Sequence, residues 1–154
     1  DVTELKYGNG SKAYLSAIID LGDNHIVSWV LGHSNNNELV FKTFDIAVEN
    51  NPEAHPLFHS DRGFQYTSPT FIQKLQEARM TRSMSRVGKC VDNGPMEGFW
   101  GILKTEMYYL KSFESYEALE GAIADYIHYY NYERYQERLN CMTPMEYHEY
   151  LKTA

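Results

Sequence analysis

The chain has 154 residues, of which 43% are hydrophobic and 14% aromatic, and its formal net charge is -7 at pH 7. This length can enclose one substantial core and fits a single domain better than two. Neither a window of eighteen apolar residues nor a basic-then-apolar N-terminal profile occurs, so we expect no membrane contact and a cytoplasmic location.

The two cysteines, Cys90 and Cys141, lie far apart and show no Cys-x-x-Cys or Cys/His spacing. This pattern argues against a disulfide framework and against a structural zinc site. We therefore expect both to be ordinary small residues.

Three short runs rich in β-branched and aromatic residues open the chain, at residues 1–7, 13–20 and 25–31. Gly8-Asn9-Gly10 and the segment 21–24 separate them, which is typical of tight turns between strands. The pattern predicts an antiparallel meander of three strands.

Residues 36–50 change to a helical period, and 56–61 form a fourth short strand that ends in polar residues. Ser68-Pro69 resembles an N-cap followed by proline at the first helical position, which predicts a helix to about residue 78. Residues 80–84 are the fifth predicted strand. We expect an α/β fold whose mixed five-stranded sheet has three antiparallel strands, then two parallel strands, with helices on both faces.

Three helices are predicted in the last third of the chain, at 95–110, 116–133 and from Thr143-Pro144-Met145-Glu146, a capping box. The first carries a core stripe of Met96, Trp100, Leu103, Met107 and Leu110. Its neighbouring stripe is Glu97, Gly101, Lys104 and Tyr108. A carboxylate, an open position and an ammonium on one flank could serve as a ligand, clearance for a bulky substrate and a phosphate contact, although solvated surface positions explain them equally.

Two further carboxylates, those of Asp61 and Asp1, could form a site together with Glu97. Asp61 ends the fourth strand and Asp1 lies on the first strand. Strand pairing can bring Asp1 and Asp61 to one edge of the sheet, and an overlying helix can add Glu97. Such like charges require a cation, and Mg²⁺ prefers carboxylate oxygens together with phosphates. Asp20 could replace Asp1 in another register, but we favour a turn-capping role for Asp20.

Basic residues gather between residues 79 and 111, where six cations stand against three carboxylates despite the acidic total. They indicate either phosphate contact or a solvated face, and Arg62 and Arg86 have the same two interpretations. Most other conspicuous polar residues receive structural interpretations: His33 and His59 as satisfied histidines, Asp92 and Asn93 as turn residues, and the tyrosines at 126, 129, 130 and 132 as core and interface.

Asp61 and Glu97 enclose 35 residues. With Asp1 they resemble the DD(35)E triad of retroviral integrases and bacterial insertion-sequence transposases. The segments HSDRGFQYTS (59–68), SMSRVGKCVDNGPMEGFWGILKTE (83–106), YIHYYNYERYQERL (126–139) and TPMEY (143–147) are similar to the catalytic core of the IS3-group transposases. Agreement of separated motifs in order and spacing is more specific than one short pattern.

The resemblance implies an RNase H-like fold over residues 1–154, with the N-terminal DNA-binding region of the family absent from this chain. It makes Asp1, Asp61 and Glu97 the metal-binding catalytic triad and Lys104 a DNA contact near it. Arg62, Arg86 and Lys89 are further DNA-binding candidates in the basic region. The family often has His where Gln136 stands and Gly near Asn140, so the resemblance says less about that region.

The implied activity is that of a polynucleotidyl transferase. It hydrolyses DNA at a 3′ end and then joins the freed 3′-OH to a phosphodiester, using two Mg²⁺ ions with Mn²⁺ as a substitute. The implied partners are the element ends, the target DNA and further copies of the chain, in a bacterial cytoplasm and without a small-molecule cofactor. Two alternatives stay open: a noncatalytic assembly and DNA-binding fragment, and an RNase H-like nuclease.

Overall fold

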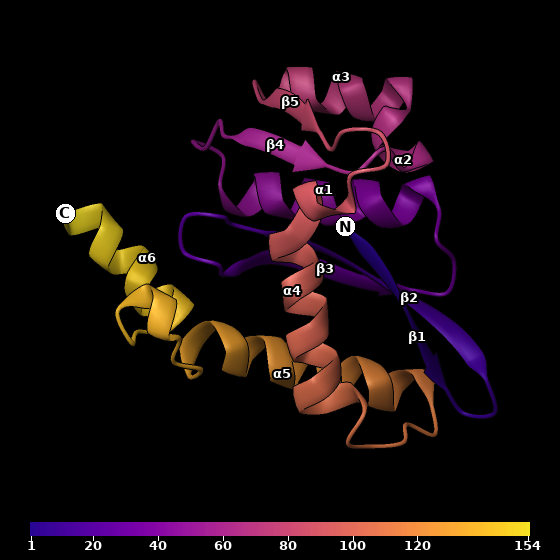
Figure 1. Ribbon diagram of the computed structural model, residues 1–154. Helices are drawn as coiled ribbons and strands as arrows, with labels where there is room; N and C mark the ends of the chain where they lie inside the picture. The colour runs from indigo at the N-terminus through magenta and orange to yellow at the C-terminus, as the bar shows by residue number, and fades with distance from the viewer.

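The computed structural model describes the backbone of residues 1–154 and every side chain except that of Cys90. The expectation for Cys90 therefore lies outside the described residues, whereas Cys141 is a free, exposed thiol. Figure 1 shows a central group of strands with helices on both sides and the C-terminal helix extending away from it. No helix in the described chain is both long and apolar enough to span a bilayer.

The N-terminal strands form the predicted meander. β1 (Val2–Tyr7), β2 (Ser11–Ile19) and β3 (Ile26–Gly32) pair antiparallel in that order. The first turn places Gly8 at φ 57° and Gly10 at φ 94°, in the left-handed region that glycine enters without a steric penalty. The three strands and their pairing sense are therefore confirmed.

The other two strands are β4 (Leu57–Ser60) and β5 (Thr81–Met84), which pair in parallel as predicted. Hydrogen bonding among the described residues nevertheless gives a three-stranded and a two-stranded sheet, whereas we predicted one sheet of five strands. β4 and β5 have only four residues each. Pro56, whose backbone nitrogen cannot donate a hydrogen bond, stands directly before β4. A strand of four residues has few backbone N–H and C=O groups with which to pair with the three-stranded sheet in addition to β5.

The helices follow their local signals. Asn36 caps α1 by accepting from the Leu39 amide, Ser68 caps α3 by accepting from the Phe71 amide, and Thr143 and Glu146 complete the capping box of α6. Their bounds are α1 Asn37–Asn50, α2 Phe64–Thr67, α3 Pro69–Glu77, α4 Gly94–Leu103, α5 Tyr116–Tyr132 and α6 Pro144–Thr153. The short α2 was not predicted, because its four residues contain no full hydrophobic period.

Two hydrophobic clusters cover the two faces of the meander. The first packs α4 and α5 against side chains such as Leu5 and Leu15, and Phe99, only 2% exposed, lies at its centre beside Tyr130. The second packs α1, α3 and β4 around Phe44 and Phe71, with Val2 and Ile18 against it. Alternate residues of the strands thus face opposite layers, which fixes α4 over one face and α1 over the other.

The predicted helix 95–110 ends earlier than expected. α4 stops at Leu103, and a π-helical segment, Lys104–Tyr108, follows, with the Tyr109 amide donating to the Lys104 carbonyl. The wider π turn breaks the 3.6-residue period. For this reason Leu110, which we predicted to lie in the core, is 73% exposed, although the other four stripe residues are buried.

Candidate functional site

The three predicted triad residues come from three separate elements. Asp1 directly precedes β1, Asp61 directly follows β4, and Glu97 lies in the first turn of α4. Asp1 and Asp61 are half-buried and Glu97 is exposed. We call these three residues the acidic edge. In Figure 1 the N-terminus lies beside the upper end of α4.

A hydrogen bond ties the first strand to α4. The Trp100 indole Nε1 donates to Asp1 Oδ2 at 3.1 Å, across 99 residues of sequence. Trp100 is 6% exposed, so its ring is anchored in the core while its N–H reaches the carboxylate. Because Trp100 is three residues beyond Glu97, it shares a helical face with it, and the contact brings the helix that carries Glu97 over Asp1.

The negative charge of Asp61 acts on the start of the first strand and on Tyr66. Burial lowers the pKa of the Asp1 amino group to about 5, and the negative charge of Asp61 acts in the opposite direction. The Asp1 nitrogen donates to the Ala17 carbonyl at 2.9 Å, and the Ala17 amide donates to the Asp1 carbonyl at 3.0 Å, so Asp1 continues the pairing of β1 with β2. Burial, with the charge of Asp61 in addition, also raises the pKa of Tyr66.

The loop after β4 holds the Asp61 carboxylate. Its Oδ1 accepts from the Gly63 amide at 2.8 Å, which makes a local turn. A Cβ at Gly63 would stand 3.0 Å from that same oxygen, so the small residue allows the close approach. The carboxylate is therefore oriented by the backbone of its own loop.

A different set of side chains brings three potential metal-ligand atoms close together. Among the described side chains, the group of three whose ligand atoms all lie within 4.8 Å of one another is Asp23, His25 and His148, and the acidic edge does not form such a group. Sequence reasoning missed this group, because only the Asp-x-His spacing is local and His148 is distant along the chain.

The flank of α4 keeps the predicted arrangement. Gly101 is exposed and a Cβ added there would meet no atom within 4 Å, while Lys104 is half-buried at the start of the π-helical segment. Tyr108, the last residue of the stripe, instead donates its hydroxyl to the Lys6 carbonyl and accepts from the Lys6 amide. Tyr108 therefore packs against β1 and is engaged structurally.

The other predicted DNA contacts differ in how they are held. Arg62 Nε donates to the Ser85 carbonyl, and Lys89 is exposed. The Arg86 guanidinium makes two hydrogen bonds to Asp92, at 2.8 and 2.9 Å, which together with a backbone bond hold the pKa of that carboxyl well below its usual range. Arg86 is thus already paired within the loop.

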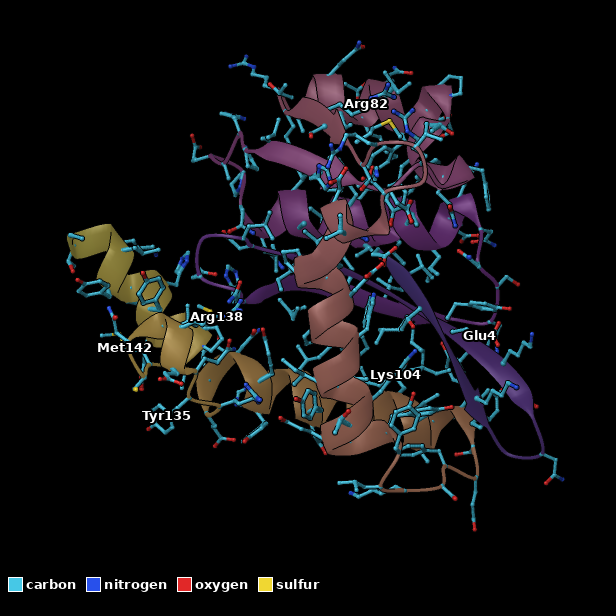
Figure 2. The ribbon with its side chains drawn as sticks, in the orientation of Figure 1. Glu4, Arg82, Lys104, Tyr135, Arg138 and Met142 are labelled. Carbon is cyan, nitrogen blue, oxygen red and sulfur yellow. The ribbon has the colours of Figure 1, made fainter. Side chains whose placement is uncertain are left out.

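The basic residues between positions 79 and 111 are spread along the molecule. Figure 2 shows Arg82 at the β5 end and Lys104 toward α5, with the length of α4 between them. These two cations of the basic segment 79–111 therefore lie toward different ends of α4.

Several structural interpretations are confirmed. Asp20 accepts from the Gly22 amide at 2.7 Å, as a turn cap does. Both ring nitrogens of His59 lie within hydrogen-bond distance of serine hydroxyls, and His33 stacks on Tyr116.

Of the four tyrosines, Tyr126 and Tyr130 are buried, and they donate to Glu106 and to the Asn24 carbonyl. Tyr129 and Tyr132 are 41% and 54% exposed, so the core interpretation holds for the first two.

Sequence families described as Integrase core domain match residues 1–90 and 97–150. An uncharacterized transposase-like protein of Haemophilus influenzae (strain ATCC 51907 / DSM 11121 / KW20 / Rd) is 45% identical over 147 residues, which cover 96% of this chain and 68% of that protein. The protein named "Putative transposase InsK for insertion sequence element IS150" of Escherichia coli (strain K12) is 41% identical, over 96% of this chain and 52% of its own length. The chain thus spans from about half to two thirds of these two relatives.

The fold agrees with that of solved integrase cores. The catalytic core domain of HTLV-2 integrase superposes with a TM-score of 0.76 over 96% of this chain and 92% of that one, at 19% identity. The fold is therefore the RNase H-like fold of integrase and transposase catalytic cores. The chain belongs to the integrase core domain family of polynucleotidyl transferases, as an IS3-group transposase catalytic core.

Proposed function

We propose that this chain catalyses metal-dependent cleavage at the 3′ ends of an insertion sequence and transfer of those ends to target DNA. The observation that carries the proposal is the hydrogen bond from Trp100 to Asp1, which fixes the helix bearing Glu97 over the first strand. Asp61, which follows β4 and has its carboxylate held by the Gly63 amide, is the third residue that we assign to the site.

The donor set of the acidic edge fits a hard divalent cation. It offers carboxylate oxygens and neither imidazole nor thiolate, which suits Mg²⁺, with Mn²⁺ as a substitute. The HTLV-2 core was solved in complex with magnesium. We infer that Asp1, Asp61 and Glu97 hold two such ions, which when bound would supply activation of the attacking oxygen and stabilisation of the leaving one.

The residues of this chain would position the reactants. Trp100 and the Gly63 amide each hold one carboxylate oxygen, so two of the ligands are oriented before DNA arrives. The Lys104 ammonium, two helical turns beyond Glu97, would contact a DNA phosphate, and Gly101 between them leaves room for the strand. Arg62 and Lys89 would add phosphate contacts, and Arg86 would do so after release from Asp92.

The partners we propose are the element ends, the target DNA and further copies of this chain assembled on them, in the bacterial cytoplasm. We also propose that residues 1–154 act as one catalytic domain. The matched families together extend from residue 1 to residue 150, which supports a single functional unit.

The test is a nicking and strand-joining assay on duplex DNA that carries the element ends, with Mg²⁺ or Mn²⁺. The wild-type chain is compared with Glu97→Gln, and with Glu120→Gln as a control at another exposed helical position. We expect activity in the wild type and the control and its loss in Glu97→Gln. Equal activity, or none, in all three proteins contradicts the proposal and favours a noncatalytic assembly role, and cleavage restricted to an RNA–DNA hybrid indicates a nuclease.

A further inference from the structure

Asp23 is a buried carboxylate outside the acidic edge. It lies in the turn between β2 and β3, and its side chain is only 2% exposed. Its Oδ1 accepts from the His25 amide at 2.9 Å and lies 2.5 Å from His25 Nδ1, while its Oδ2 lies 2.5 Å from His148 Nδ1. Because an unpaired buried charge is very unfavourable, this arrangement of partners is what allows Asp23 to be buried.

The three residues join two distant parts of the chain. His148 belongs to α6 and lies 125 residues from Asp23 in the sequence. The rings of His25 and His148 stand 5.0 Å apart between centroids, at 63° to each other, so both imidazoles converge on one carboxylate. In Figure 1 the turn between β2 and β3 lies on the same side of the molecule as α6.

We propose that Asp23, His25 and His148 form a binding site for a transition-metal dication such as Zn²⁺, which fastens α6 to the turn between β2 and β3. We call these residues the imidazole–carboxylate cluster. One ligand atom from each residue lies within 4.8 Å of the other two. Two imidazoles and one carboxylate are a set that holds zinc in proteins, with the fourth position open to water.

The adjustment required for binding is small. Tetrahedral zinc with bonds of about 2.0–2.1 Å separates its ligand atoms by about 3.3 Å. The two contacts of 2.5 Å involve different oxygens of Asp23, so with one oxygen as the ligand only the contact to that oxygen must widen, by somewhat under 1 Å. The His148 side chain is 29% exposed and that of His25 is 13% exposed, so the metal has an approach beside His148. In the metal-free cluster the carboxylate accepts from Nδ1–H of each imidazole, so binding of a metal through Nδ1 requires the proton of each neutral ring to move to Nε2, and no proton is released overall.

Chemistry separates this site from the acidic edge. Nitrogen ligands favour Zn²⁺ and Co²⁺ over Mg²⁺, whereas an all-carboxylate set favours Mg²⁺. The sequence argument against zinc considered cysteine spacing, but here the ligands meet only through the fold. The proposal is independent of the catalytic function, since none of its three residues belongs to the acidic edge.

The experiment titrates Co²⁺ by visible absorption, and Zn²⁺ by calorimetry, into tag-free chain that was stripped with a chelator and then supplied with millimolar Mg²⁺. We expect the chain to bind one equivalent of Co²⁺ and to show the visible absorption of four-coordinate Co²⁺. His148→Gln should weaken binding at least tenfold. His128→Gln, which changes a histidine stacked on Tyr132, should not, and neither should Asp61→Asn combined with Glu97→Gln.

A second measurement guards against a variant that fails to fold. His25→Gln is titrated in parallel, each variant is checked by circular dichroism, and hydrogen exchange of residues 144–153 is measured in wild type with and without Zn²⁺. We expect slower exchange with the metal. Absence of saturable Co²⁺ binding by the folded wild type, or unchanged affinity in both histidine variants, overturns the proposal and leaves a hydrogen-bonded contact between α6 and the turn.

Discussion

The acidic edge and the imidazole–carboxylate cluster are two environments for aspartate in one small domain. In the cluster, both oxygens of Asp23 have partners from the chain itself and the side chain is buried. At the acidic edge, Asp1 and Asp61 are half-buried, Glu97 is exposed, and the neighbouring charges have the same sign. In the folded chain Asp23 is paired with two imidazoles, whereas the acidic edge brings charges of one sign together, and our proposal is that a cation and DNA compensate them.

Asp61→Asn should show the largest effect and should act on activity rather than stability. The amide oxygen can still accept from the Gly63 amide, but the negative charge is gone. We expect strand joining to fall by more than about 100-fold, because a metal ligand is lost, with the melting temperature unchanged or raised by relief of repulsion.

The matched control is Asp125→Asn, at an exposed position of α5. Strand joining with Mg²⁺ and thermal unfolding are measured on the same preparations. A lower melting temperature together with full activity would place Asp61 with Asp23, as a structural carboxylate, and would remove the contrast between the two regions.

Asp23→Asn should show the opposite pattern. An amide cannot accept from both imidazoles as a carboxylate does, and its NH₂ group faces a ring nitrogen. In buffer free of transition metals we expect a loss of about 2–3 kcal/mol in the free energy of unfolding by urea, with strand joining unchanged per folded molecule. Asp20→Asn, which keeps the cap on the Gly22 amide, should be nearly neutral.

Local signals explain what could be predicted from the sequence. The starts of α3 and α6 are each encoded within four residues, by Ser68-Pro69 and by the Thr143 capping box, and both agree with the structure. Gly8 and Gly10 likewise mark the first turn. The predicted strand order suggested that Asp1 and Asp61 could meet at one edge of the sheet, and the resemblance of whole motifs to a family then selected them, with Glu97, as the triad.

What escaped prediction depends on contacts between distant residues. The π-helical segment after Leu103 places Glu106 beside Arg134, and the meeting of Asp23 with His148 requires α6 to pack near the first sheet. Neither contact has a periodic signal. The division of the strands into two sheets likewise depends on how few hydrogen bonds a four-residue β4 can add.

Trp100→Phe tests how the acidic edge is held. Phenylalanine keeps an aromatic ring in the core but removes the N–H that donates to Asp1. We expect about a tenfold loss of strand joining, as for other groups that orient metal ligands, and about 1 kcal/mol or less in stability. Trp29→Phe, a half-buried control on β3, should leave activity unchanged, and equal activity losses in both variants would contradict a positioning role for Trp100.

Glu106 extends the comparison along the helix that bears Glu97. Hydrogen bonds from Arg134 lower the pKa of Glu106, burial opposes them, and the Tyr126 hydroxyl adds to the lowering. A lowered carboxyl pKa stabilises the fold above the ordinary value of 4.5 and loses that contribution as pH falls below it. Glu106→Gln should therefore lose about 1 kcal/mol at pH 7 relative to wild type, and less at pH 3.5.

Urea unfolding at both pH values measures this difference. Arg134→Gln should lose a similar amount at pH 7, and the double variant should lose little more than either single one, because all three remove the same ion pair. A gap between wild type and Glu106→Gln that is constant with pH would mean that the charge of Glu106 does not stabilise the fold.

Gly101→Ala should have the smallest effect and the most selective one. Gly101 and Gly121 both lie in helices and both have open space at the Cβ position, so alanine should raise the free energy of unfolding by about 0.5–1 kcal/mol at either site. Only Gly101 lies between Glu97 and Lys104. If this face takes DNA, Gly101→Ala alone should also reduce strand joining by a few-fold. Equal stabilisation with undiminished activity in both variants would show that the missing side chain at Gly101 gives no clearance to DNA, and would confine the functional surface to the carboxylates themselves.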